Sequence, residues 1–130
     1  MSSTTRTVEE AARALGVSRD HIVKTLIVVC RDTVLAVIVP GDRRLDFSKL
    51  RGVGRDCRLA RADEVEKITG YPAGGVPPVA LPEHVRVVMD RSLLEKDFVY
   101  GGGGGDNLLL RFSPRELASL GLAQVLDVSR

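Results

Sequence analysis

The stretch that decides the fold is Ile22-Val23-Lys24-Thr25-Leu26-Ile27-Val28-Val29-Cys30, an apolar run interrupted only by Lys24 and Thr25. It is rich in β-branched residues, which favour a strand. Arg31-Asp32-Thr33 has the composition of a hairpin turn, and Val34 to Val39 is a second apolar run of strand length. The two runs therefore predict a pair of strands that are neighbours in one sheet.

Further short strands and short helices follow along the chain. Strands are expected at Cys57–Ala60, Val85–Met89, Phe98–Tyr100, Leu108–Phe112 and Ala123–Val128. Asp90-Arg91-Ser92 reads as a turn after one of them. Because hairpin-like neighbours dominate, we expect an α+β fold with a mixed, largely antiparallel sheet rather than a doubly wound parallel one.

Helix starts are recognisable from capping residues. Thr7 and Glu10 form a capping box before a helix that Gly16 ends, and Ser18 to His21 forms a short turn of helical character. Later signals are Ser48 as the cap of a short helix near Leu50, Asp63 with Glu66 before a helix through Thr69 that stops at Gly70, and Ser113-Pro114-Arg115-Glu116 before a helix that ends at Gly121.

Length and composition restrict the class of protein. The 130 residues, 44% hydrophobic and 28% charged, predict a single folded domain over residues 1–130. No apolar run approaches the ~20 residues that span a bilayer, and the first residues lack an apolar signal region, so we expect no membrane and a cytoplasmic location. Cys30 and Cys57 lack metal-ligand or redox spacing and are expected to be reduced core residues, while His21 and His84 form no metal motif.

The net charge of +2 is unevenly distributed. Only Asp46 and Asp56 oppose the seven basic residues between Arg43 and Arg61, which are Arg43, Arg44, Lys49, Arg51, Arg55, Arg58 and Arg61. Such a segment is either an ordinary solvated surface or a surface that meets phosphates. Composition alone does not decide between the two interpretations.

A loop dense in glycine and proline, Gly70-Tyr71-Pro72-Ala73-Gly74-Gly75-Val76-Pro77-Pro78, is the clearest candidate for a binding site. Glycines allow a ligand to approach backbone N–H groups, and prolines stiffen the loop around them. Such a loop suits a site built from backbone donors, although an ordinary surface turn has the same composition.

Lys24 is the second candidate. It shares a strand face with Leu26 and Val28, where it is either a strand-end lysine that reaches solvent or a cation beside a pocket, ready for a phosphate or carboxylate. The run Gly101–Gly105 lacks a phosphate-binding pattern and is expected to be a flexible loop. No Ser-His-Asp or Cys-His arrangement and no pair of carboxylates stands out.

Seven segments in order carry a resemblance to the YbaK family, the free-standing relatives of the editing domain of bacterial prolyl-tRNA synthetase. They are Thr7-Val8-Glu9-Glu10-Ala11-Ala12, Leu15-Gly16-Val17, Ile22-Val23-Lys24-Thr25-Leu26, Pro40-Gly41-Asp42-Arg43-Arg44-Leu45, Thr69-Gly70-Tyr71, Gly74-Gly75-Val76-Pro77-Pro78 and Phe112-Ser113-Pro114-Arg115-Glu116-Leu117. Each is weak alone, but their order is specific. The resemblance covers nearly the whole chain from Thr7 onward and implies a barrel-like sheet with short flanking helices.

The resemblance also implies an activity, the hydrolysis in trans of the ester of mischarged tRNA, with tRNA(Pro) carrying alanine or cysteine as the leading substrate. Lys24 would contact the tRNA end near the scissile ester, and Gly74, Gly75, Val76, Pro77 and Pro78 would supply backbone groups around the carbonyl. The implied nucleophile is water or a group of the substrate, with no protein nucleophile, cofactor or metal. The implied partners are aminoacylated tRNA and prolyl-tRNA synthetase.

Weaker candidates complete the predicted site. Those for substrate contact are Thr25, Gly41, Asp42, Asp90, Gly102, Gly103 and Asn107, and those for tRNA contact are Arg43, Arg44 and Lys49. Many family members have a helix and a strand before the segment that matches Thr7, so the resemblance implies that these elements are missing here. Some members carry an aspartate or histidine where Leu109 stands, and Asn107 shares its strand parity.

Two alternatives of other classes remain at this stage. Residues Glu10 to Ile22 resemble a helix-turn-helix, which would make the protein a DNA-binding regulator, although the second helix would run into strand-like sequence. The other alternative is a module that binds tRNA or a synthetase without catalysis.

Overall fold

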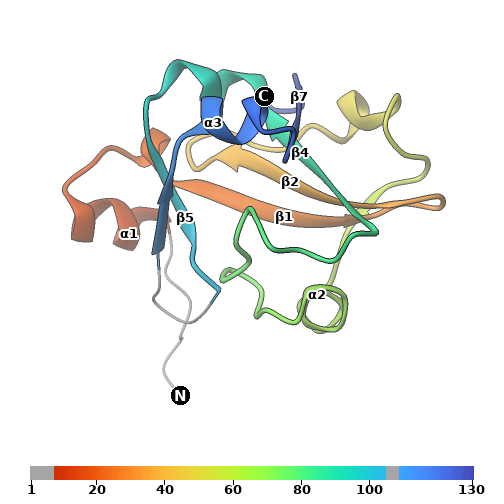
Figure 1. The fold of residues 1–130 in the computed structure, drawn as a ribbon. Coiled ribbons are helices and arrows are strands. Elements are labelled where there is room, and N and C mark those ends of the chain that lie inside the picture. The colour runs from red at the N-terminus through yellow and green to blue at the C-terminus, as the bar shows by residue number, and fades with distance from the viewer. Residues whose placement is uncertain (1–7, 105–108) are drawn as a thin grey trace.

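The computed structural model describes residues 8–104 and 109–130. Its short helices are interspersed among the strands along the chain (Figure 1). The α-helices are α1 (Val8–Leu15), α2 (Ala62–Thr69) and α3 (Pro114–Ser119), and the 3₁₀ helices are η1 (Arg19–His21), η2 (Phe47–Leu50) and η3 (Arg91–Glu95). The strands are β1 (Val23–Val29), β2 (Val34–Pro40), β3 (Arg58–Leu59), β4 (Val85–Asp90), β5 (Val99–Gly102), β6 (Leu109–Phe112) and β7 (Gln124–Leu126).

The predicted hairpin β1–β2 forms the centre of a five-stranded sheet with the order β3-β1-β2-β4-β7. β1 runs antiparallel to β2 and β3, whereas β4 runs parallel to β2 and β7. β5 and β6 form a separate antiparallel ribbon, which crosses the start of β1 through a bridge between Ile22 and Tyr100. The α+β class with a mixed sheet is confirmed, but among the described residues the strands close no barrel.

Successive side chains of each strand point to opposite faces of the sheet, so the hydrophobic core has one part on each face. One face presents Val28, Val37 and Val88 to the segment around η2 and to the C-terminal residues. The opposite face is covered near one end by α2 and the loop that follows it, and near the other by η3, α3 and the β5–β6 ribbon. The sheet thus brings the loop after α2 and the ribbon to the same face.

Helix caps follow the predicted logic at some ends and depart from it at others. The Ser113 hydroxyl accepts the N–H of Glu116 at the start of α3, as predicted. α2 instead begins after Arg61, whose N–H donates to the carboxylate of Glu64, so the predicted box at Asp63 and Glu66 is wrong. At η2 the cap is Asp46, which accepts the N–H of Ser48, so Ser48 is not the cap. Thr7 lies outside the described residues.

The helix-turn-helix alternative is wrong. The segment that would form the recognition helix is only the three-residue η1, and the chain enters β1 at Val23. The β-branched residues that follow His21 form strand pairs along the whole length of β2, so they are not helical.

The two cysteines form a disulfide, which corrects the prediction that both are reduced. The physical reason is strand register. Val29 is paired with Arg58 in the β1–β3 ladder, so Cys30 and Cys57 are the next residues opposite each other where that ladder ends. The spacing of 27 residues gives no local sign of this pairing.

Reduction of this disulfide is expected to lower the free energy of unfolding by roughly 3–4 kcal/mol, because the bond restricts a loop of about 27 residues in the unfolded chain. The measurement is urea unfolding with and without dithiothreitol. A Cys30→Ser/Cys57→Ser double variant is the control and should unfold at the reduced midpoint in both buffers. An unchanged midpoint for the wild type under reduction would contradict the expectation.

No helix within residues 8–104 and 109–130 has the length and apolar character of a membrane span. The same residues contain no cluster of three or more His, Cys, Asp or Glu side chains suited to a metal ion.

Candidate functional site

Strand β5, here called the glycine strand because it ends in Gly101 and Gly102, meets the glycine-proline loop Gly70–Pro78 backbone to backbone. The two segments are far apart in sequence. A Cβ atom on Gly102 would lie 2.8 Å from both the carbonyl carbon of Gly75 and the carbonyl oxygen of Val76. Two residues further on, the N–H of Gly104 donates to the carbonyl oxygen of Gly75 over 2.9 Å. Only a residue without a side chain fits at Gly102. Gly101 and Gly102 belong to β5, which corrects the prediction that they lie in a flexible loop.

The loop itself is anchored in the protein rather than being a surface turn. Gly75 to Pro78 are buried, and the Val76 side chain, only 3% exposed, packs with Ile27 of β1 and Val85 of β4. The N–H of Gly75 donates to the carbonyl oxygen of Pro72, whereas the N–H of Val76 meets no acceptor among the described residues. A buried N–H group of this kind is a donor available to a ligand.

Lys24 lies at the start of β1, next to the residue that touches the glycine strand. A Cβ on Gly101 would lie 2.8 Å from Cγ2 of Val23, so the ribbon passes directly over Lys24's neighbour. The Lys24 ammonium donates to the carbonyl oxygen of Arg43 over 3.1 Å. Partial burial, and then the charge of Arg44, lower the pKa of Lys24 below its usual 10.5, against the opposing effect of Asp42 and Glu9.

Gly41 fixes the turn that presents this acceptor to Lys24. Its N–H donates to the carbonyl oxygen of Ile22, and a Cβ there would lie 2.6 Å from Cγ1 of Val8 in α1. The turn Gly41–Arg44 is therefore held against α1 and η1. In this way the structure brings Lys24, Gly41 and Asp42 to one end of the β1–β2 pair.

Thr25, also a predicted contact, has a buried hydroxyl with an unusual property. It is the single buried side-chain polar atom among the described residues that lacks a hydrogen-bond partner. Side chains alternate along β1, so Thr25 lies on the opposite sheet face from Lys24 and on the same face as Val23 and Ile27. Val23 contacts Gly101, and Ile27 packs with Val76. An unsatisfied hydroxyl between these contacts is available to a bound molecule or a water.

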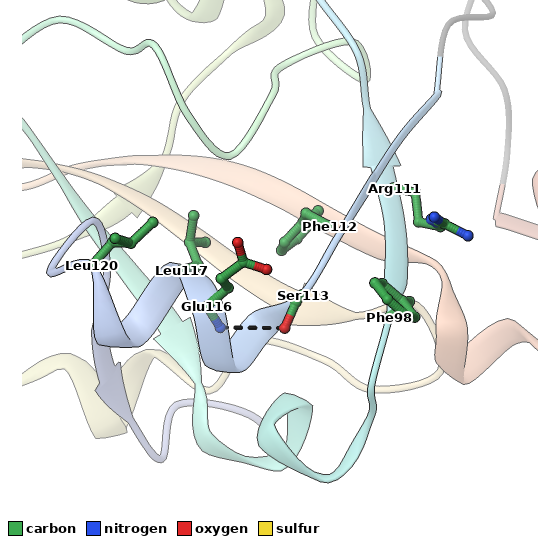
Figure 2. A pocket seen from close by; sticks show the side chains of 7 residues that line it. All are labelled: Phe98, Arg111, Phe112, Ser113, Glu116, Leu117 and Leu120. Atoms are coloured by element: carbon green, nitrogen blue, oxygen red, sulfur yellow. Dashed lines mark hydrogen bonds between the residues drawn. The ribbon is translucent and has the colours of Figure 1, made fainter.

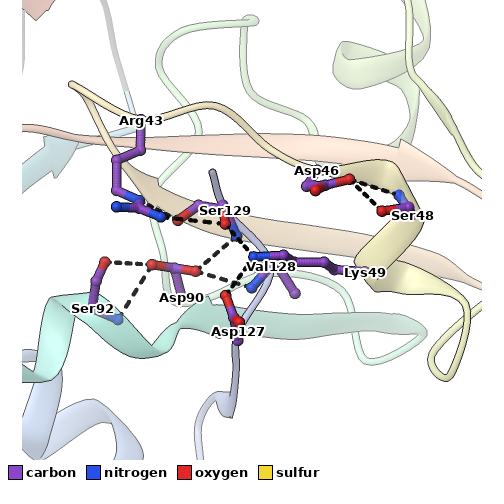
Figure 3. Close-up of polar contacts among 9 residues, drawn as sticks. All are labelled: Arg43, Asp46, Ser48, Lys49, Asp90, Ser92, Asp127, Val128 and Ser129. Atoms are coloured by element: carbon purple, nitrogen blue, oxygen red, sulfur yellow. Dashed lines mark hydrogen bonds and ion pairs between the residues drawn. The ribbon is translucent and has the colours of Figure 1, made fainter.

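Asp90 occupies a different position, at the centre of a polar network around the C-terminal residues (Figure 3). Its side chain is 2% exposed, and one carboxylate oxygen accepts the N–H groups of Val128 and Ser129, each over 3.0 Å. The other oxygen accepts the N–H and hydroxyl of Ser92. With both oxygens engaged by the protein, Asp90 fastens the C-terminal segment.

Two of the predicted tRNA contacts join the same network (Figure 3). Nε of Arg43 donates to the hydroxyl of Ser129 over 2.6 Å, and the Lys49 ammonium donates to the carbonyl oxygen of Ser129 and to Asp127. Backbone bonds between Arg44 and Arg130, and from the N–H of Asp46 to Val128, complete a short ladder. The ladder holds the segment whose Arg43 carbonyl receives Lys24.

The charge of Asp90 is expected to stabilise the fold. Burial alone would raise the pKa of Asp90, but hydrogen bonds from Ser92, Val128 and Ser129 together hold it below its usual 3.8. A carboxyl group with a lower pKa in the folded state contributes stability above its unfolded pKa, and this is lost as the pH falls through the folded value.

Asp90→Asn should therefore lower the free energy of unfolding at pH 7 by about 2 kcal/mol. The amide NH₂ of asparagine would replace one acceptor oxygen and would point at backbone N–H groups that need an acceptor. Urea unfolding between about pH 2.5 and pH 7 measures this, and the difference between wild type and variant should shrink below about pH 4. A difference that is constant with pH would contradict the assignment to the charged carboxylate.

The remaining basic residues divide into paired and unpaired groups. Arg58 and Arg61 flank Glu64, and a two-bond contact from Arg58, followed by the Arg61 N–H, lowers the pKa of Glu64 to about 2. No ion pair within the described residues engages Arg44 or Arg51. The seven residues predicted as one basic surface are therefore not equally available to a phosphate.

Some parts of the site fall outside the prediction or outside the description. Gly103 follows directly on β5, whereas Asn107 lies outside the described residues. The sequence analysis missed Ser129 and Asp127, because only the fold brings the last residues to Arg43 and Lys49. Tyr71, which belongs to the predicted loop, places its ring 3.1 Å from a Cβ built on Gly104.

Known proteins resemble this chain in sequence. The chain is 35% identical over 106 residues to proline--tRNA ligase of Thermoanaerobacter sp. strain X514, an alignment over 78% of this chain and 19% of that enzyme. The chain therefore spans about a fifth of the length of this ligase. It is also 33% identical over 127 residues to the uncharacterized protein YwhH of Bacillus subtilis, covering 95% of this chain and 81% of YwhH.

Solved structures show the same fold. The hypothetical protein APE2540 superposes with a TM-score of 0.93 at 55% identity, covering 100% of this chain and 88% of its own. A candidate trans-editing enzyme for prolyl-tRNA synthetase superposes with a TM-score of 0.88 at 38% identity, covering 100% and 83%. The family model for the aminoacyl-tRNA editing domain matches residues 2–120. The chain is thus a member of the aminoacyl-tRNA editing domain family.

Proposed function

We propose that this protein hydrolyses the ester bond of mischarged tRNA in trans, with alanine or cysteine on tRNA(Pro) as the substrate. The observation that carries the proposal is the buried Val76 N–H, which has no acceptor among the described residues and lies in a loop held against the glycine strand. A preorganised N–H donor is suited to the oxyanion that forms when water attacks an ester carbonyl.

The mechanism assigns roles that need no protein nucleophile. Water attacks the carbonyl carbon, the Val76 N–H in the loop Gly74–Pro78 donates a hydrogen bond to the developing oxyanion, and the C–O bond to the terminal ribose breaks. The leaving ribose oxygen takes up a proton, so that the amino acid and the free tRNA end are released. The Lys24 ammonium, fixed by Arg43, binds the negatively charged tRNA end close to the ester.

Such a reaction answers a physical limit on selectivity. A synthetase pocket built for proline rejects smaller amino acids weakly, because a missing methylene is worth only about 1–3 kcal/mol. A second, smaller site that hydrolyses the wrong products removes the error. We propose that the protein does this in the cytoplasm, on tRNA released by or still bound to prolyl-tRNA synthetase, and that Arg43, Arg44 and Lys49 meet the tRNA backbone.

The test is release of labelled amino acid from tRNA(Pro) charged with alanine, cysteine, serine or proline. We expect rapid release of alanine or cysteine and slow release of proline. Binding of the charged tRNAs without release of any of the four amino acids would favour a non-catalytic module that binds tRNA.

Charge reversal at Arg44 should weaken tRNA binding and reduce the dependence of the binding constant on salt concentration. An unchanged salt dependence would exclude Arg44 from the tRNA interface.

Thr25→Val is expected to separate activity from stability. Valine has nearly the shape of threonine but no hydroxyl, so the variant loses an unsatisfied buried group, and its free energy of unfolding should rise by up to about 1 kcal/mol. If the hydroxyl bonds the aminoacyl group, deacylation should fall roughly 3- to 10-fold. Urea unfolding and deacylation rates measure both effects. Thr25→Ser keeps the hydroxyl and should retain activity, and full activity in Thr25→Val would exclude the contact.

A further inference from the structure

A recess lies where the β5–β6 ribbon meets α3 (Figure 2). It is an open cavity of about 280 Å³ between the ribbon and α3. Its apolar walls are Phe98, Phe112, Leu117 and Leu120, and its polar groups are Arg111, Ser113 and Glu116. Phe98 is 47% exposed and Leu120 66% exposed, so large apolar surfaces are left open to solvent.

Arg111 and Phe98 form a stacking pair at one wall of this cavity. The Arg111 guanidinium carbon lies 4.6 Å from the centre of the Phe98 ring, and no ion pair engages Arg111 within the described residues. An arginine and an aromatic ring side by side, both open to solvent, form a stacking platform for bases of single-stranded nucleic acid. The free positive charge also suits the phosphate that accompanies each base.

Ser113 and Glu116 line the same cavity from the start of α3. The Ser113 oxygen already accepts the Glu116 N–H over 3.2 Å, which fixes both residues at the first turn of the helix. In Figure 2 the Glu116 carboxylate points toward Phe112 and the interior of the recess. A carboxylate in this position accepts a hydrogen bond from an exocyclic amino group, as cytosine N4 offers, and uracil has no such group.

We propose that this recess is a nucleotide subsite, which takes an amino-bearing base from the single-stranded 3′ end of an RNA. The proposal rests on the proposed function, because the substrate there is an ester at an RNA end. Phe98 directly precedes β5 and lies four residues, or roughly 13 Å, before Gly102. A single strand whose terminal ester lies at Gly75 and Gly102 can therefore place a preceding base against Phe98.

The experiment uses the full chain and an uncharged, fluorescent single-stranded RNA that ends in CCA, with fluorescence anisotropy as the readout. Phe98→Ala should weaken binding roughly 5- to 150-fold, as expected for the loss of one stacked base. Arg111→Lys keeps the charge but loses the planar surface, so it should also weaken binding. Leu59→Ala, an equally exposed apolar residue on β3, is the matched control and should bind like the wild type.

A second probe tests the base contact. An otherwise identical RNA with uridines in place of both cytidines should bind the wild type more weakly, and Glu116→Gln should narrow that difference. Wild-type affinity in both Phe98→Ala and Arg111→Lys would overturn the subsite, and equal binding of the two RNAs would overturn the amino-group contact. Circular dichroism confirms folding, and Arg111→Lys keeps the test valid if Phe98→Ala unfolds.

Because the probe is uncharged, its binding is independent of deacylation. RNA binding that depends on Phe98, in a protein that releases no amino acid, would sustain the subsite while rejecting the hydrolase. Amino acid release at the wild-type rate and KM in Phe98→Ala and Arg111→Lys, together with their wild-type RNA affinity, would reject the subsite while sustaining the hydrolase.

Discussion

Lys24→Ala is expected to reduce the rate of deacylation of mischarged tRNA by roughly 10²-fold, because it removes the ammonium that holds the tRNA end beside the ester, and a displacement of about 1 Å at the reacting bond costs about this much. The lysine is held by the Arg43 carbonyl at the start of β1, so its loss removes a fixed positive charge rather than a mobile one. The fold should survive, because the side chain is only partly buried.

The control is Lys67→Ala, which removes an exposed lysine from α2 and should leave the rate unchanged. The pH dependence gives a second readout. Because the pKa of Lys24 lies below 10.5, activity that needs the ammonium should be lost as the pH rises through this lowered value, after subtraction of uncatalysed hydrolysis. A rate in Lys24→Ala within a factor of about two of the wild type would exclude Lys24 from the reaction.

Gly102→Ala is the second variant with a large expected effect. Its methyl group would need to occupy space 2.8 Å from the backbone of Gly75 and Val76, so the strand or the loop must move. A displacement of about 1 Å at a catalytic group can cost about 10²-fold in rate, and we expect a loss of this size.

Gly52→Ala is the matched control, since a Cβ at Gly52 would meet nothing within 4 Å. It should retain the wild-type rate and melting temperature. A single-turnover deacylation assay, with near-ultraviolet circular dichroism to verify packing, measures the effect. Full activity in Gly102→Ala would show that the contact between β5 and the loop does not position the reacting groups.

Local sequence signals predicted the parts of the fold that depend on neighbours in the chain. The apolar runs on either side of Arg31-Asp32-Thr33 predicted β1 and β2, and Ser113 with Pro114 predicted the start of α3. These features follow from residue type and spacing alone. The contact of Gly102 with Gly75 could not be predicted in this way, because it depends on how the ribbon crosses the sheet.

The same distinction explains the errors. Cys30 and Cys57 meet because β1 pairs with β3, and a shift of one residue in this register would already separate them. The hydrogen bonds from Val128 and Ser129 to Asp90 leave no sign in the sequence near Asp90, because these residues lie 38 and 39 positions further along the chain. The capping box predicted at Asp63 does not form. Glu64 is the capping residue instead, and it is also paired with Arg58 of β3, a contact that depends on the fold.

The ladder between residues 44–46 and 128–130 also has a consequence for protein synthesis. The ribosome makes residues 128–130 more than 80 residues after the segment to which they bind, so a nascent chain contains β1 and β2 well before this ladder can form. Until then Arg43 and Lys49 lack Ser129, and the carbonyl that receives Lys24 is not yet fixed. The proposed arrangement around Lys24 is therefore complete only after residues 128–130 have left the ribosome, however early the central hairpin folds.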